Sequence, residues 1–263
     1  GALIVGASRA LGEERSIPGR MDALVALTGD VLSRAAREGR SPHHVALETR
    51  IARFVGKPAA KIFNSAYTAN CGLALAVSTP ATFWVGDQLN HNSSLRVSTD
   101  PRPARRHDHL VECLRAVPAG IERVMVIFDG IFSMRGDFAP IDRIAAVVAP
   151  FREKFPGGLV TIVDDSHGIG AYGPAGRGTV GHTGTLPDVV IGTFGKAFGV
   201  NGGFIAASPT VIEAVRQRAD TYIYTNPLSV ADCAAAAVAV ELCDGPEGLS
   251  RLAHLQEMTA RFR

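Results

Sequence analysis

The sequence has no long uninterrupted apolar run, and its 263 residues include only four cysteines. No run reaches the ~18 apolar residues that a membrane-spanning helix needs, and no basic segment followed by an apolar stretch opens the chain. The cysteines lack C-x-x-C spacing, which disfavours a zinc site or a disulfide framework and favours reduced, packed thiols. We therefore expect a cytoplasmic protein that no membrane segment anchors.

The chain also has little excess charge, with a formal net charge of +2. Its densest basic run, RPARRH at residues 102–107, is short and has no interleaved aromatic residues, so we expect no nucleic-acid partner. The histidines at 43, 44, 107 and 109 do not follow the spacing of a metal-ligand set, so we expect no metal. With 46% hydrophobic residues, the chain is long enough to bury the core of one large globular domain, or of one and a half domains.

Continuous β-branched runs alternate with amphipathic helical segments along the chain. This alternation predicts an α/β fold with a mostly parallel sheet and helices on both faces. The predicted strands are VMVIF (124–128), LVTIV (159–163), VVI (189–191) and GGFIAAS (202–208). The predicted helices are IDRIAAVVAPF (141–151), a helix that begins at Ser208 with Pro209 in its first turn, and a buried alanine-rich helix in residues 227–243.

Polar clusters follow three of these runs. They lie around Ser133, around Asp164 and His167, and around Thr193 and Lys196. Ligands of such sheets bind beyond the carboxyl ends of the strands, so we expect these side chains at one edge.

Lys196 and the aspartates after the second of these strands have distinctive settings. Lys196 stands out because glycines surround it in VVIGTFGKAFGVNGG (189–203), where the backbone is free to approach a ligand. Aspartate after a strand also commonly caps the following turn, and we favour that role for Asp165.

A lysine in this setting suggests a nucleophile that forms an imine with an aldehyde. Pyridoxal 5′-phosphate fits the other groups, because a carboxylate keeps its ring nitrogen protonated and backbone amides at a helix start bind its phosphate. NSAYTANCGLALAV (64–77), where small residues open a helix, is the expected phosphate site.

Six motifs in order resemble the α-oxoamine synthase family of fold-type I pyridoxal-phosphate enzymes. The matching segments are H-x-x-LE-x-x-IA-x-F (44–54), SAYTAN (65–70), DQLNHNS (87–93), DGIFSMRGD (129–137), VDDSHGIGAYGPAGRG (163–178) and GTFGKAFG (192–199). DGIFSM, DDSHG and YIYTNPLS look closest to the 2-amino-3-ketobutyrate coenzyme A ligase branch. The resemblance implies a C-acyltransferase that condenses a small, glycine-like amino acid with an acyl thioester, carried on coenzyme A or a carrier protein. It also implies a homodimer with shared active sites.

Two alternatives stay open. One is another pyridoxal-phosphate reaction on the same fold, such as that of an aldolase or an aminotransferase. The other is a non-catalytic dimer partner, although such relatives usually lack the lysine and Lys196 is present.

The resemblance also implies roles for single residues. Lys196 corresponds to the Schiff-base lysine, which then moves the substrate α-proton. Asp164 corresponds to the carboxylate at the pyridine nitrogen and His167 to the partner of the phenolic oxygen. His91 corresponds to the histidine that stacks on the cofactor and later polarises the acyl carbonyl, and Ser133 to a serine near the ring oxygen.

The phosphate ligands follow from the same resemblance. They are Thr193 and the backbone amides of Ala66 and Tyr67, with Thr225 contributed across the dimer. Family members usually have glycine at the position of Ala66 and often glutamate at that of Asp129, so the phosphate site and the group beneath the cofactor differ slightly here.

We expect three parts: an N-terminal segment at 1–40 that matches the family poorly, a cofactor-binding large domain at 41–245, and the start of a helix at 246–263 that leads to a small domain outside this chain. In the family that small domain carries the arginine that binds the substrate carboxylate. ALIVGASRALG (2–12) resembles the opening of a short-chain dehydrogenase, but no Y-x-x-x-K pair follows. We favour the family's GSR-type segment for it.

Overall fold

The computed structural model describes residues 41–96 and 107–262. The chain divides into two units between Val45 and Ala46. The described part of the first unit is residues 41–45, where the Ser41 hydroxyl lies 2.6 Å from Nδ1 of His44. The ALIVGASRALG segment and most of the basic run lie outside the described residues.

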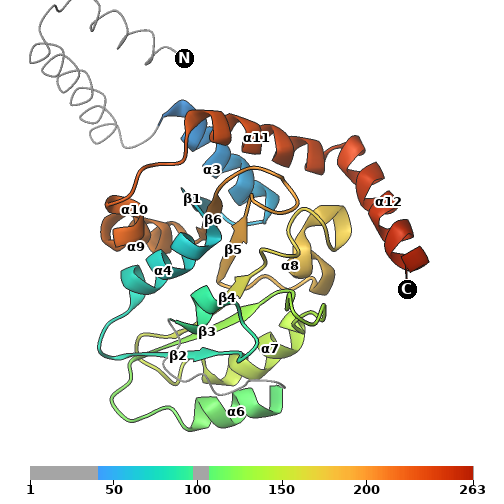
Figure 1. Cartoon of the computed structure of the whole chain (residues 1–263). Helices are drawn as coiled ribbons and strands as arrows, with labels where there is room; N and C mark the ends of the chain where they lie inside the picture. Colours follow the sequence, from blue (N-terminus) through green and yellow to red (C-terminus); the bar gives the residue numbers. More distant parts are fainter. Residues whose placement is uncertain (1–40, 97–106, 263) are drawn as a thin grey trace, which may run out of the picture. The chain divides into compact units, whose positions relative to one another are not determined.

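The second unit is built on one six-stranded sheet with the order β1-β6-β5-β4-β3-β2 (Figure 1). The strands are β1 (Ala59–Phe63), β2 (Thr82–Gly86), β3 (Arg123–Asp129), β4 (Leu159–Asp164), β5 (Val189–Thr193) and β6 (Gly203–Ala207). β2, β3, β4 and β5 pair in parallel, whereas β6 runs antiparallel between β5 and β1. The predicted mostly parallel α/β sheet is confirmed, and the four predicted strands correspond to β3, β4, β5 and β6.

Helices lie between most of the strands, before β1 and after β6. They are α3 (Pro42–Phe54), α4 (Ala66–Val77), α5 (Asn92–Leu95), α6 (His107–Arg115), α7 (Ile141–Val148), α8 (Gly178–Thr183), α9 (Pro209–Arg218), α10 (Asp220–Ile223), α11 (Val230–Asp244) and α12 (Pro246–Phe262), with 3₁₀ turns at Ala149–Phe151 and Pro174–Gly176. No helix in the described residues is long and apolar enough to cross a membrane.

Side chains from both faces of the sheet are buried, which explains why its strands read as continuous apolar runs. On one face, Val190 and Phe204 pack with α3 and α11. On the other, Ile191 and Ile205 pack with α4 and α9. α6 and α7 cover β2, β3 and β4 through a third cluster that includes Val126.

Two predicted helices can be compared with the structure. α9 has Ser208 as its N-cap, and the Ser208 hydroxyl accepts from the Val211 amide, as predicted. The buried alanine-rich helix differs from the prediction: α11 begins at Val230 and buries only one face, through Cys233, Ala236 and Val240. Its small alanines do not need full burial, and Val238 on the other face is 55% exposed.

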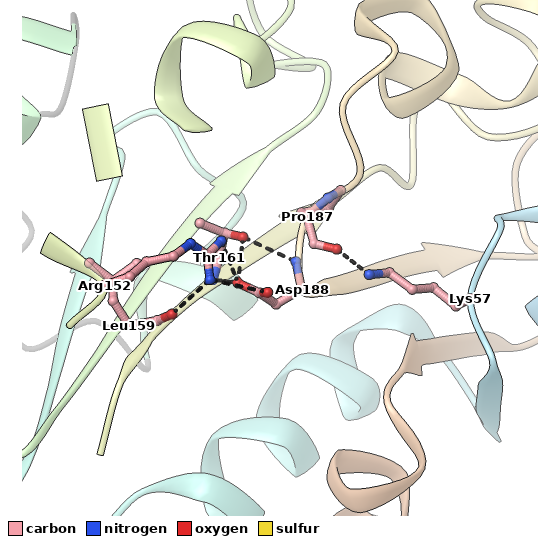
Figure 2. A network of polar contacts seen from close by, with 6 residues as sticks. All are labelled: Lys57, Arg152, Leu159, Thr161, Pro187 and Asp188. Carbon is pink, nitrogen blue, oxygen red and sulfur yellow. Dashed lines mark hydrogen bonds and ion pairs between the residues drawn. The ribbon is translucent and has the colours of Figure 1, made fainter. Parts of the chain in front are cut away.

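A polar network fixes the start of β4 against the start of β5, at the edge opposite the strands' carboxyl ends (Figure 2). Asp188 accepts from the Thr161 amide and hydroxyl, both at 2.8 Å, and pairs with Arg152 at 3.1 Å. Nearby, the Lys57 amine donates to the Pro187 carbonyl. These bonds hold the two strands that end at Asp164 and Thr193 in register.

Candidate active site

A cavity of about 190 Å³ opens at the carboxyl ends of the parallel strands. Five segments that are far apart in the sequence contribute to it: the start of α4, the loop after β2, and the ends of β3, β4 and β5. Its lining residues are Ser65, Ala66, Tyr67, His91, Asp129, Asp164, Ser166, His167, Thr193 and Lys196. The position agrees with the sheet edge expected from the sequence.

Seven of the nine residues that the sequence singled out line this one cavity. Ser133 and Thr225 do not line it. Ser133 lies exposed after β3. Thr225 is also exposed, and its hydroxyl donates to the Thr221 carbonyl at 2.8 Å. The roles given to these two residues stay predictions, and Thr225 was expected to act across a dimer.

The start of α4 offers free backbone donors to the cavity. Ser65 caps this helix: its hydroxyl accepts from the Thr68 amide at 3.1 Å, and the Thr68 hydroxyl in turn accepts from the Ser65 amide. The first intrahelical bond is donated by the Ala69 amide, so the amides of Ala66 and Tyr67 precede it. A helix N-terminus of this kind favours a phosphate group.

Gly203 allows β6 to lie close to this helix start. A Cβ at this position would come within 2.3 Å of the Ala66 nitrogen. The second glycine of the NGG stretch therefore has a packing reason, because any side chain would push α4 away from the sheet.

Lys196 lies in the turn between β5 and β6, which Thr193 organises. The Thr193 hydroxyl donates to the Gly202 carbonyl and accepts from the Gly195 amide, both at 3.0 Å. Gly199 closes the turn with a φ of 66°, a left-handed conformation that favours glycine. The glycines around Lys196 therefore make a tight, hydrogen-bonded turn that holds the lysine at the cavity.

The amine of Lys196 has a lowered pKa. Loss of surrounding water lowers the pKa, and the carboxylates of Asp164 and Asp129 oppose this effect. Desolvation also lowers the pKa of His167, with a contribution from the positive charge of Lys196. A lowered pKa raises the fraction of free amine, which is the nucleophilic form of a lysine.

Both oxygens of Asp164 accept hydrogen bonds from fixed donors. Oδ2 lies 2.6 Å from Nδ2 of Asn70, and Oδ1 accepts from the Ser166 amide at 3.1 Å. Asn70 is only 1% exposed and lies one turn into α4. The sequence analysis did not identify Asn70; the available signal was a polar residue in an otherwise apolar helix.

Asp129 lies beside Asp164 because these two residues are register partners on β3 and β4. Its Oδ2 accepts from the His91 amide at 2.9 Å, whereas Oδ1 is buried and has no hydrogen-bond partner among the described residues. Burial, together with the negative charge of Asp164, raises the pKa of Asp129 to about 8. Asp129 therefore keeps its proton to a higher pH than a free aspartate does.

Asp165 has a structural role that differs in detail from the expected cap of the following turn. Its Oδ2 accepts from the Thr179 amide at 2.7 Å and so binds the first turn of α8, while its main-chain oxygen accepts from the amides of Gly168 and Ile169. Burial raises the pKa of Asp165 to about 7. The side chain thus ties the loop that carries Asp164 and His167 to α8.

The fold is the α/β architecture of fold type I, with a lysine turn, a buried carboxylate and a helix start at one sheet edge. Residues 31–263 match the family described as aminotransferase class I and II, and the chain belongs to this family.

The reported relatives confirm the resemblance to α-oxoamine synthases. The chain is 40% identical over 231 residues to the 8-amino-7-oxononanoate synthase of Halorhodospira halophila, covering 86% of this chain and 55% of that protein. The serine palmitoyltransferase (SPT) of Sphingomonas wittichii superposes with a TM-score of 0.74 at 25% identity over 97% of this chain and 60% of the other. A structure of SPT with PLP superposes with a TM-score of 0.73 at 26% identity, over 83% of this chain and 55% of the other. The chain thus spans a little over half the length of these proteins.

Proposed function

We propose that this chain carries the cofactor site of a pyridoxal-phosphate-dependent C-acyltransferase, which condenses a small amino acid with an acyl thioester. The observation that carries the proposal is the convergence of Lys196, Asp164, His167 and His91 from three segments on one cavity. The names of the relatives support the same reaction class. Three sequence motifs, DGIFSM, DDSHG and YIYTNPLS, resemble the 2-amino-3-ketobutyrate coenzyme A ligase branch. The identities of the amino acid and of the acyl group remain predictions.

The residues around the cavity fit the cofactor chemically. Asp164 offers acceptor oxygens to a protonated ring nitrogen, and the amides of Ala66 and Tyr67 offer donors to a phosphate. Thr193 also lines the cavity, and its hydroxyl donates to the Gly202 carbonyl in this structure. When bound, pyridoxal phosphate supplies an aldehyde that combines with amines and a ring that withdraws electrons.

The protein residues then divide the work. Lys196, with its lowered pKa, takes the α-proton from the amino acid. Asp164 is held in a fixed orientation because its oxygens accept hydrogen bonds from Asn70 and Ser166. The α-carbon forms a bond to the thioester carbonyl carbon, the carbon–sulfur bond breaks, and the thiol leaves with a proton. His91 polarises the carbonyl oxygen during this attack.

The proposal includes a homodimer with shared sites in the cytoplasm. The segment from Tyr224 to Asn226 supports the shared site, because it is exposed and Tyr224 is 80% exposed. Asn64 donates to the Asn226 carbonyl at 2.7 Å, which keeps this segment next to the start of α4. The small number of cysteines supports a reducing compartment.

Thiol release tests the proposal most simply. Purified protein loaded with pyridoxal phosphate is given glycine, alanine or serine with an acyl-coenzyme A, and free thiol is measured. One amino acid should release thiol in proportion to the ketone product formed. Transfer of amino groups to keto acids without thiol release would support an aminotransferase, and no reaction with any pair would support the non-catalytic partner.

A further inference from the structure

Four buried or cavity-lining groups form a continuous hydrogen-bonded chain from Asp164 to His91. Asn70 Nδ2 lies 2.6 Å from Asp164 Oδ2 and 3.1 Å from Ser93 Oγ. Ser93 Oγ lies 2.8 Å from Nδ1 of His91. Asn70 and Ser93 are each 1% exposed, so water does not compete for these contacts.

The direction of each bond follows from the chemistry of its atoms. The orientation of the Asn70 amide is fixed, because exchanging its oxygen and nitrogen would place two oxygens 2.6 Å apart at Asp164. Nδ2 can only donate, and its two hydrogens serve Asp164 Oδ2, Ser93 Oγ and the Ala66 carbonyl, which lies 3.2 Å away, so at Ser93 it is Oγ that accepts. The single hydroxyl hydrogen of Ser93 is then available to donate to His91.

A second donor points to the same imidazole nitrogen. The backbone amide of Ser93 donates to His91 Nδ1 at 3.3 Å, and a backbone N–H has no acceptor function. Nδ1 therefore uses its lone pair and carries no hydrogen. The amide of His91 is itself held by Asp129 Oδ2 at 2.9 Å, which fixes the backbone from which the ring extends.

We propose that Asn70 and Ser93 are positioning residues that lock His91 as the neutral tautomer with its hydrogen on Nε2. The ring edge opposite Ser93 then presents an N–H donor. His91 is exposed and lines the cavity, so this donor is accessible to a ligand.

The fixed tautomer of His91 extends the proposed function, and its role in catalysis rests on that function. An Nε2–H group donates to a carbonyl oxygen and so suits an acyl thioester that is being attacked. Nδ1, occupied by two donors, is unsuited to accept the α-proton. The division of labour follows: His91 supplies the electrophilic hydrogen bond and Lys196 moves the proton. Asn70 also connects the orientation of His91 to Asp164, because one amide nitrogen serves both.

The test is nuclear magnetic resonance on the ¹⁵N-histidine-labelled protein without substrates. Two-bond ¹H–¹⁵N spectra at neutral pH report which ring nitrogen carries hydrogen, and the loss of one signal set in His91→Gln assigns His91. We expect a protonated Nε2 and an unprotonated Nδ1. A protonated Nδ1 in the unmodified protein overturns the proposal, and this result needs no variant to fold.

Variants then test the two positioning residues. Ser93→Ala should give a mixture of His91 tautomers, and Asn70→Leu should shift the populations in the same direction. Ser94→Ala is the matched control, since Ser94 is also buried and adjacent, but its hydroxyl has no hydrogen-bond partner in the part of the chain that the structure describes. An unchanged His91 tautomer in Ser93→Ala, with the fold preserved, contradicts a lock by Ser93.

Kinetics separate the lock from the proposed function. In Ser93→Ala, kcat for thiol release should fall about tenfold with little change in KM for the amino acid, less than the ~10²–10³-fold that loss of a whole preorganised donor costs. If the spectra show the lock but no thiol is released from the unmodified enzyme, the proposed reaction fails and the lock stands. If the unmodified enzyme releases thiol with Nδ1 of His91 protonated, the lock fails and the reaction stands.

Discussion

Asp129 and Asp164 are register partners at the ends of two neighbouring parallel strands, and both are buried. Asp164 receives two hydrogen bonds, whereas one oxygen of Asp129 receives none. Burial and the nearby negative charge of Asp164 both disfavour ionisation of Asp129 and so raise the pKa of Asp129. The raised pKa of Asp129, about 8, follows from this arrangement and from burial.

Asp129→Asn should change how stability depends on pH. An unfolded aspartate loses its proton near pH 4, but folded Asp129 keeps it up to about pH 8, so the folded state binds more protons in this window. The free energy of unfolding therefore falls as pH rises, by at most about 1.4 kcal/mol per pH unit for this group. The variant should show a shallower fall in urea titrations between about pH 5 and pH 8.

Part of the slope should persist in Asp129→Asn, because Asp165 has a raised pKa of about 7 and acts in the same direction. Asp137→Asn serves as the control, since Asp137 lies in an exposed ion pair with Arg135. Equal slopes in Asp129→Asn and the unmodified protein would show that Asp129 is ionised near pH 7.

Asp164→Asn should separate cofactor binding from turnover. The phosphate donors at the start of α4 are unaffected, so the variant should still bind pyridoxal phosphate. Turnover should fall by about 10²-fold or more, because an amide supplies no negative charge to a protonated ring nitrogen. The free energy of unfolding should fall by about 1–3 kcal/mol, since an amide side chain has one acceptor oxygen and either Asn70 or Ser166 loses its hydrogen-bond acceptor. Thiol release near the unmodified rate would contradict the role of Asp164.

Gly178→Ala should be much more destabilising than Gly136→Ala. Both glycines have a positive φ, 72° and 75°, so the backbone strain of an alanine is matched. A Cβ at Gly178 would come within 1.9 Å of Asp165 Oδ2, whereas nothing lies within 4 Å of a Cβ at Gly136.

We expect a loss of about 1–2 kcal/mol for Gly136→Ala, from left-handed strain alone. Gly178→Ala should lose at least about 3 kcal/mol, because the clash with Asp165 adds to the strain. Urea unfolding at one pH measures both values. Similar losses in the two variants would mean that Asp165 moves freely and does not tie its loop to α8.

Asp188→Ala should remove the contacts that hold the start of β4 against the start of β5 and so destabilise the protein. The side chain accepts from Thr161 and pairs with Arg152, and these contacts lower its pKa against the opposing effect of burial. We expect a loss of about 1–3 kcal/mol in the free energy of unfolding at neutral pH. The effect should fade as pH falls through the low pKa of folded Asp188, because the stabilising charge is lost there. Asp137→Ala should be nearly neutral, and an equal loss in both variants would contradict the account.

The sequence predicted the elements better than their pairing. β3, β4 and β5 were recognisable because strands buried on both faces are continuously apolar, and Ser208 with Pro209 marked the start of α9. The insertion of antiparallel β6 between β5 and β1 depends on contacts between distant segments, which no local pattern encodes. The sequence also did not predict that one face of α11 is exposed, because alanine is compatible with both a buried and an exposed helix face.

The site shows the same division. Lys196, Asp164 and His167 follow strands in recognisable motifs, so the sequence placed them at the correct sheet edge. The sequence did not reveal Asn70 and Ser93, because their importance depends on hydrogen bonds between distant residues. Asn70 and Ser93 are 23 residues apart, and Asn70 and Asp164 are 94 residues apart. A single polar residue inside a helix does not reveal such a partner.

The most direct test of the central claim is to locate the lysine that binds the cofactor. The sequence has four lysines, at 57, 61, 154 and 196. The protein is incubated with pyridoxal phosphate, reduced with borohydride and digested, and the modified peptide is identified by mass spectrometry. Lys57→Ala serves as the control, since burial also lowers the pKa of Lys57, which lies at the other end of β5. We predict stoichiometric modification of Lys196 in both proteins and none in Lys196→Ala. Modification spread equally over the four lysines, or undiminished in Lys196→Ala, would contradict the account.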